Sequence, residues 1–179
     1  MLTTENSLVL VIDFQERLMP YICQCEELTR KAAVFIKGCR ALALPLLVMQ
    51  QYTKGLGSTV PEIREALGAF EPIEKITFSC CKNEKFLSEA ASAGKQNVIV
   101  TGVEAHICVQ QTVLDLLDKG YAVYVAADCI GSRFESDRLY AERRMERAGA
   151  VLTTMESVLF ELLVRADHPK RKEISLLVK

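Results

Sequence analysis

Short apolar runs alternate with longer amphipathic stretches along the chain. The runs are typical of strands buried on both faces of a parallel sheet, and we expect strands at Ser7–Asp13, Pro45–Gln51, Asn97–Thr101, Tyr121–Ala126 and Ala150–Thr153, with a brief extended segment at Pro72–Lys75. Apolar positions three and four residues apart predict helices at Glu26–Ala43, Pro61–Leu67, Ser79–Ala93, Cys108–Lys119, Glu135–Ala148 and Glu156–Arg165. This alternation predicts an α/β fold, a doubly wound, Rossmann-like parallel sheet of about six strands with helices on both faces.

Length and composition favour an ordinary globular protein. The 179 residues suit one domain, so we expect a single domain over residues 1–179. The net charge of −1 gives no electrostatic reason to expect nucleic acid or a membrane as partner. The N-terminus lacks the features of a signal peptide, and no apolar run approaches the roughly 20 residues that span a bilayer. The seven cysteines are an odd number, which favours free thiols in a reducing compartment, so we expect a cytoplasmic protein.

Motifs for the common cofactors are missing. After the first strand stands Asp13–Gln15 instead of the Gly-x-Gly-x-x-Gly turn of dinucleotide sites, and no Gly-x-x-x-x-Gly-Lys-Ser/Thr occurs. The glycines and closing proline of Tyr52–Pro61 predict a plain loop. With only two histidines, neither near the paired cysteines, a zinc site lacks ligands. We therefore expect no cofactor and no metal.

Three complementary side chains are predicted at one edge of the sheet. Asp13 ends the first strand, Lys75 ends the third, and Cys108 lies in the first turn of the helix after the fourth. Ligands of such sheets bind beyond the carboxyl ends of the strands. A helix start and a nearby ammonium both favour a thiolate, a carboxylate can take the thiol proton, and backbone N–H groups at the helix start, including that of Cys108, can stabilise an oxyanion.

Structural roles for these three residues are equally compatible with the pattern. Asp13 is also expected as a turn residue, Lys75 as the surface partner of Glu74, and Cys108 as a core residue. The sequence pattern alone does not decide whether these three residues have structural or catalytic roles.

Two other residues are alternative bases. His106 lies two positions before Cys108, and residues so spaced on a helix do not face each other, so we expect it to line the pocket or point outward. Asp128 ends another strand and ranks second to Asp13, because the stretch that follows it, Cys129–Arg133, is predicted to form a turn held by the arginine.

The chain resembles the isochorismatase-like cysteine hydrolase family, which includes nicotinamidases and related amidases. The matching stretches are Val9–Gln15, Ile73–Ser79, Thr101–Val109, Asp128–Arg133, Gly149–Thr153 and Glu156–Ser157. In that family an Asp, a Lys and a Cys act together, and the resemblance places them at Asp13, Lys75 and Cys108. It also implies a homo-oligomer, a dimer or tetramer, and a cis peptide between Val103 and Glu104 beside the oxyanion donors.

Within the family, the chain is most similar to the isochorismatase domain-containing proteins, through Gln50–Glu62 and His168–Ile174. It departs from two other branches. The Asp-x-His metal motif of nicotinamidases is replaced by Gln50–Tyr52, so neither metal dependence nor nicotinamide is implied. Isochorismatases that cleave a vinyl ether generally lack the nucleophilic cysteine, so Cys108 argues against that reaction.

Together, residues and resemblance predict a cofactor-independent hydrolase that forms a thioester on Cys108 with a small amide or related acyl substrate. The oxyanion region is expected at Val103, Glu104 and Cys108, and the pocket is expected to be lined by Phe14, Gln51, Tyr52, Phe78, His106 and Ile107. Two alternatives stay open: a small-molecule-binding or scaffold protein that keeps the hydrolase fold, and a redox sensor that pairs Cys108 with Cys129 or another thiol.

Overall fold

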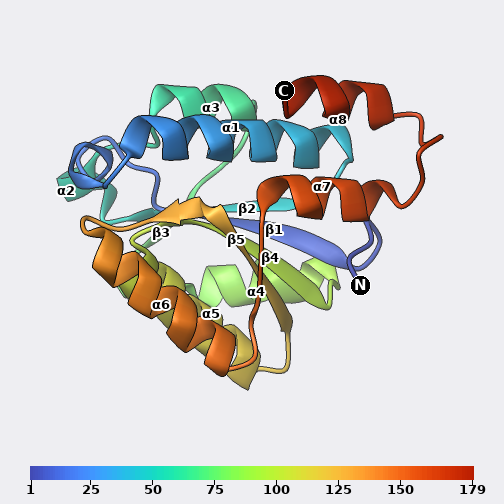
Figure 1. Cartoon of the computed structure of the whole chain (residues 1–179). Coiled ribbons are helices and arrows are strands. Elements are labelled where there is room, and N and C mark those ends of the chain that lie inside the picture. The colour runs from blue at the N-terminus through green and yellow to red at the C-terminus, as the bar shows by residue number, and fades with distance from the viewer.

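The chain folds into a six-stranded sheet between two layers of helices (Figure 1). The computed structural model describes residues 1–179. The strands are β1 (Ser7–Ile12), β2 (Leu46–Gln51), β3 (Ile73–Lys75), β4 (Asn97–Val103), β5 (Ala122–Gly131) and β6 (Val151–Thr153). All neighbours pair in parallel, in the order β3-β2-β1-β4-β5-β6, which confirms the predicted doubly wound sheet. The order reverses between β1 and β4, where ligands of such sheets bind.

The helices divide between the two faces of the sheet (Figure 1). Helices α1, α3, α7 and α8 cover one face, and α4, α5 and α6 cover the other. Their bounds, together with the short α2 at the edge of the sheet, are α1 (Cys25–Ala41), α2 (Thr53–Leu56), α3 (Pro61–Leu67), α4 (Glu84–Ala93), α5 (Gln110–Asp118), α6 (Glu135–Arg147), α7 (Met155–Leu163) and α8 (Arg171–Leu177). No helix combines the length and apolar character that crossing a membrane requires.

Each face of the sheet has its own hydrophobic core, because side chains alternate along a strand. On β1, Val9 and Val11 point into the first core, which packs against α1 and α7. Leu10 and Ile12 point into the second core, under α4, α5 and α6. Burial of every residue of β1 explains its near-continuous apolar sequence.

The strand β5 runs beyond the predicted Tyr121–Ala126 segment, and the turn predicted at Cys129–Arg133 is wrong for its first three residues. A bulge shifts the pairing of β4 and β5, after which Gly102 pairs with Ile130 and the strand continues to Gly131. The polar Asp128 is accommodated there because its carboxylate accepts the backbone N–H of Met155 at 2.8 Å.

Two predicted segments contain short helical turns that the spacing of apolar residues did not predict. The predicted loop after β2 includes the single-turn helix α2. The predicted helix Ser79–Ala93 is a 3₁₀ turn at Cys80–Lys82 followed by α4. Asn83 divides them, because its side chain accepts the N–H of Phe86 and so caps α4.

Gly102 brings β1 and β4 together directly below the predicted site. Its φ of +138° lies in a region that residues with a Cβ rarely adopt. A Cβ at this position would lie 2.2 Å from the carbonyl oxygen of Ile12, a backbone atom that cannot move without breaking the sheet. The predicted strand ends at Thr101, but β4 continues through Gly102 to Val103, and the glycine is a point of close contact inside the sheet.

We expect Gly102→Ala to lower the free energy of unfolding by about 3 kcal/mol, through overpacking against the backbone and a strained conformation. Urea denaturation would measure this loss. Gly120→Ala is the matched control: its φ is +85°, but nothing lies within 4 Å of its Cβ, so only about 1 kcal/mol is expected. Equal losses in the two variants would contradict the close contact.

Candidate active site

The ends of β1 and β3 place a buried ion pair at the predicted edge of the sheet. Lys75 Nζ donates to Asp13 Oδ2 at 2.7 Å, and both side chains are fully buried. The alternative pairing of Lys75 with Glu74 is wrong, because a carboxylate oxygen of Glu74 instead accepts the backbone N–H of Thr53. The two strands meet through β2, which lies between them in the sheet.

Asp13 leaves the strand in a left-handed conformation, with a φ of +54°. Asp tolerates this conformation better than most residues, and such strain is common at functional sites. The backbone turns sharply at Asp13, and the two oxygens of its carboxylate have different surroundings. Oδ2 is held by Lys75, whereas Oδ1 is the one buried side-chain oxygen or nitrogen in the structure without a hydrogen-bond partner. A buried, unpartnered acceptor is ready to take a proton.

Cys108 lies in a single π-helical turn, Ala105–Val109, between β4 and α5. A cis peptide bond joins Val103 to Glu104 just before this turn. The thiol Sγ lies 4.0 Å from the amide oxygen of Gln51, and the residue is 6% exposed. Thr112 fixes the turn from α5, because its hydroxyl donates to the carbonyl oxygen of Cys108 at 2.7 Å.

Electrostatics keep the thiol of Cys108 protonated in the free protein. Burial and the nearby Asp13 carboxylate raise the pKa of Cys108 to about 12, against the opposing effect of Lys75. The expectation that the helix start favours a resting thiolate is therefore wrong, because the turn is buried and faces a carboxylate.

The two charged partners titrate abnormally as well. Burial raises the pKa of Asp13, and Lys75 offsets only part of this rise. Burial alone would lower the pKa of Lys75, but attraction to Asp13 and the neighbouring thiols outweighs it, so that pKa is raised. Lys75 therefore remains an ammonium, while Asp13 becomes a stronger base than an exposed carboxylate.

The predicted pocket residues fall into different places. Gln51 lies between Lys75 and Cys108 and is 8% exposed, while Tyr52 and Phe78 are about half exposed on neighbouring loops. Ile107 is partly buried against the second core. The placement of Phe14 is corrected: its side chain is 1% exposed and packs in the first core, so it does not line the pocket.

His106 turns toward β5 and α6. Its Nδ1 lies 2.9 Å from the hydroxyl of Ser132, and its Nε2 lies 3.8 Å from a carboxylate oxygen of Asp137. Its ring contacts hold the π-helical turn against the start of α6, and none of them is with the thiol of Cys108. His106 is therefore not placed as the base for this thiol.

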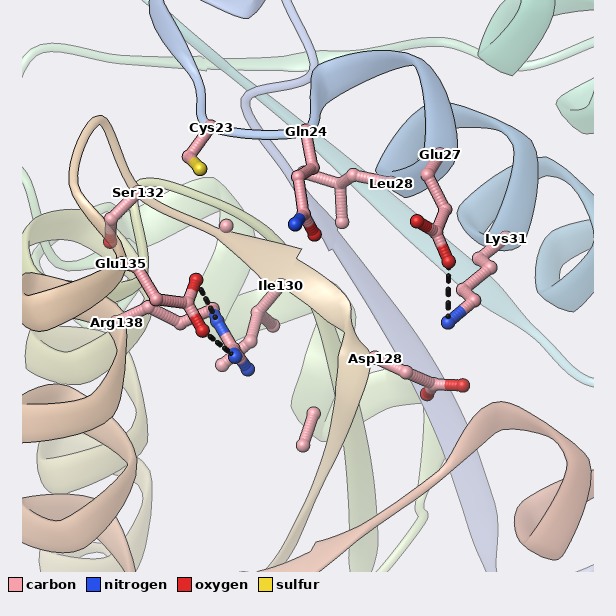
Figure 2. A pocket seen from close by; sticks show the side chains of 12 residues that line it. Cys23, Gln24, Glu27, Leu28, Lys31, Asp128, Ile130, Ser132, Glu135 and Arg138 are labelled. Atoms are coloured by element: carbon pink, nitrogen blue, oxygen red, sulfur yellow. Dashed lines mark hydrogen bonds and ion pairs between the residues drawn. The ribbon is translucent and has the colours of Figure 1, made fainter.

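Asp128, the second candidate base, lies in a separate pocket between α1, β5 and α6 (Figure 2). The pocket is lined by charged side chains that already pair with one another, Glu27 with Lys31 and Glu135 with Arg138. Since the carboxylate of Asp128 accepts a backbone N–H of α7, it is not placed to serve Cys108.

Residues for a metal site do not come together. The structure contains no group of three or more His, Cys, Asp or Glu side chains that could hold a metal ion. At the end of β2, Gln50 and Gln51 use their amides in hydrogen bonds with neighbouring protein groups. The nicotinamidase type of metal therefore does not fit these residues.

Gln15 is a site residue that sequence reasoning missed. It is fully buried, and its amide bonds both the N–H and the carbonyl of Gln51. It stands in the matched stretch after Asp13, but no spacing rule links it to a residue 36 positions later. Thr112 was missed for the same reason, since only the fold brings its hydroxyl to Cys108.

Comparison with known proteins identifies the family of the chain. The isochorismatase domain family matches residues 7–157. Isochorismatase domain-containing protein 1 of Danio rerio is 39% identical over 178 residues, which are 99% of this chain but only 62% of that protein. A structure of the MAR1 ribonuclease from Caenorhabditis elegans is 40% identical, with a TM-score of 0.92 over 99% of this chain and 91% of that one.

A second solved structure has a lower identity. The YcaC gene product of Escherichia coli, described as an octameric hydrolase of unknown specificity, is 25% identical, with a TM-score of 0.88 over 97% of this chain and 85% of that one. The family match covers well over half of the chain. The chain therefore belongs to the isochorismatase domain family.

Proposed function

We propose that this protein is a cysteine hydrolase of small amides or related acyl compounds, working through a thioester on Cys108 without a cofactor. Its family supports hydrolysis in general. The observation that carries the specific proposal is the unpartnered Oδ1 of Asp13, a buried acceptor on a carboxyl that shifts the pKa of the Cys108 thiol and is shifted by it. A binding protein would gain nothing from leaving this oxygen bare, because an unsatisfied buried acceptor costs about 1–3 kcal/mol.

In the first half-reaction, Asp13 takes the thiol proton as Sγ attacks the substrate carbonyl. Backbone N–H groups of the turn after the cis peptide stabilise the oxyanion. Collapse of this intermediate breaks the C–N bond, and Asp13 returns its proton to the leaving amine. Lys75 remains an ammonium beside both reacting groups, which balances the negative charge that moves between them.

In the second half-reaction, water attacks the thioester while Asp13 accepts a water proton. The C–S bond breaks, the acid leaves, and the proton returns to Cys108. The buried position of the thiol limits the reaction to substrates small enough to reach a residue that is 6% exposed.

The acyl-enzyme is the direct test. Incubation with p-nitrophenyl acetate, an activated acyl donor, should add one acetyl group that peptide mapping assigns to Cys108 and that hydroxylamine removes. In Asp13→Asn, loss of the acetyl group should slow by about 10²–10⁴-fold, because water loses its base. Intact-mass spectrometry over time measures both steps. Acetylation at other residues, or at Cys108 with unchanged release in the variant, would contradict the mechanism.

RNA is a weaker candidate substrate. The Caenorhabditis elegans neighbour is named a ribonuclease. This chain has 22 basic and 23 acidic residues, a balance without the positive charge that RNA binding relies on. The amide reaction is therefore favoured over cleavage of RNA.

We also propose a homo-oligomer in a cytoplasmic setting. The octameric neighbour supports assembly, as do exposed apolar side chains such as Tyr21, Phe134 and Tyr140. All seven cysteines are free, which suits a reducing compartment.

A further inference from the structure

The side-chain amide of Gln51 touches both Lys75 and Cys108. Its oxygen accepts a proton of Lys75 Nζ at 2.5 Å and lies 4.0 Å from Sγ of the resting thiol. Its nitrogen donates to the carbonyl oxygen of Ile76 at 2.6 Å. Turning the amide over would place NH₂ against the ammonium and a carbonyl oxygen against a carbonyl oxygen. The amide oxygen therefore faces the reacting groups.

The backbone of Gln51 is held just as firmly. Gln15 Oε1 accepts its N–H at 2.7 Å, and Gln15 Nε2 donates to its carbonyl at 3.0 Å and to that of Gly57 at 2.7 Å. On the other side, Gln51 is paired with Lys75 in the register of β2 and β3. Both ends of the residue are fixed before any substrate arrives.

This contact divides the ammonium of Lys75 between two acceptors. One proton goes to Asp13 Oδ2 and one to Gln51, which leaves one for the sulfur. Without the amide oxygen, the ammonium would be free to bridge both carboxylate oxygens of Asp13. The base would then be occupied, and the cation would move away from the thiol.

We propose that Gln51 is a positioning residue that holds Lys75 off Asp13 Oδ1 and near Cys108. This inference rests on the proposed cysteine chemistry and extends it from three residues to four. It also replaces the substrate-binding role expected for Gln51 from the sequence, since the oxygen that would face a substrate is engaged by Lys75.

The test is the pH dependence of Cys108 alkylation, which needs no substrate. Iodoacetamide labelling between pH 7 and 10, with peptide mapping, gives the rate at this thiol alone. We expect Gln51→Leu to lower the rate about tenfold at each pH, equivalent to a rise of about one pKa unit. Gln51→Met has a side chain of similar length but also lacks an acceptor for Lys75, so its rate should fall by about the same factor.

Gln50→Leu is the matched control. Gln50 is the adjacent residue on β2, is similarly buried, and bonds through its amide to Thr59 and Thr53 without touching the ion pair. Its loss should reduce stability but leave the Cys108 profile unchanged. Circular dichroism restricts the comparison to folded variants, and Gln51→Met keeps the test open if Gln51→Leu does not fold.

Wild-type alkylation rates in both Gln51 variants, or an equal loss in Gln50→Leu, would overturn the proposal. If wild-type protein fails to form an acyl-enzyme while the Gln51 variants still show slower alkylation, the proposed hydrolysis is wrong and the positioning role stands. If the wild-type protein forms the acyl-enzyme and the Gln51 variants are alkylated at the wild-type rate, the hydrolase proposal stands and the positioning role is wrong. The experiments therefore distinguish failure of the hydrolase proposal from failure of the positioning role.

Discussion

Replacing Cys108 by alanine should lower hydrolysis of any amide or ester that the wild-type protein cleaves by at least about 10⁴-fold. Loss of a nucleophile removes the covalent route, and other hydrolases lose activity on this scale when theirs is removed. The fold should persist, because the change leaves only a small void at a site that is already 6% exposed. Initial rates with a panel of small amides and p-nitrophenyl esters would measure the loss.

Cys129→Ala is the control for this experiment. Cys129 is also buried, but it belongs to the first core, whereas Cys108 belongs to the second, so the sheet separates the two thiols. The variant should keep full activity. Retained activity in Cys108→Ala would remove the nucleophile from the mechanism. The same separation removes Cys129 as a disulfide partner of Cys108 in the redox alternative.

Lys75→Met should lower the free energy of unfolding by about 3–5 kcal/mol, the usual cost of breaking a buried ion pair from one side. The methionine fills similar space, but Asp13 is left as a fully buried carboxylate without its cation. Lys82→Met is the control, because Lys82 pairs with Asp115 at 3.4 Å at the surface and should contribute less than about 1 kcal/mol. Urea denaturation at pH 7 compares the two variants.

The pH dependence of the Lys75→Met variant distinguishes this explanation from simple loss of packing. Burial already raises the pKa of Asp13 in the wild-type protein, and removing the ammonium raises it further. The folded variant then binds a proton more tightly than the unfolded chain, whose Asp titrates near about pH 4. Because the unfolded chain is the same for this carboxyl in both proteins, the stability deficit should be smallest in acid and grow only once the pH rises above the already raised pKa of Asp13 in the wild-type protein. A deficit that is constant with pH would contradict the electrostatic cause.

The fold was predictable from sequence because its strands are buried on both faces and read as apolar runs. The sheet edge followed as well, because carboxyl ends of parallel strands coincide, and this brought Asp13 and Lys75 together in prediction. The extension of β5 past Ala126 was not predictable, because it depends on a bulge in the neighbouring strand and on a long-range hydrogen bond to Asp128.

The site was predictable in Asp13, Lys75 and Cys108, but the contacts of its neutral amides were not. Gln51 and Gln15 form their bonds across 24 and 36 residues of sequence, and neutral amides show no pattern that marks such contacts. The state of the Cys108 thiol was also out of reach. A helix start alone favours ionisation, and only the folded structure reveals the burial and the neighbouring carboxylate that reverse it.

The high pKa of the Cys108 thiol affects how readily its sulfur is oxidised. Peroxides and electrophiles attack the thiolate, and a pKa of about 12 leaves on the order of one molecule in 10⁴–10⁵ ionised near pH 7.5. The idle protein thus keeps its sulfur in a latent form, although Asp13 stands ready beside it. In the proposed mechanism, the thiol loses its proton only as it attacks a substrate carbonyl, so oxidants that destroy permanently ionised cysteines would find little thiolate between reaction cycles.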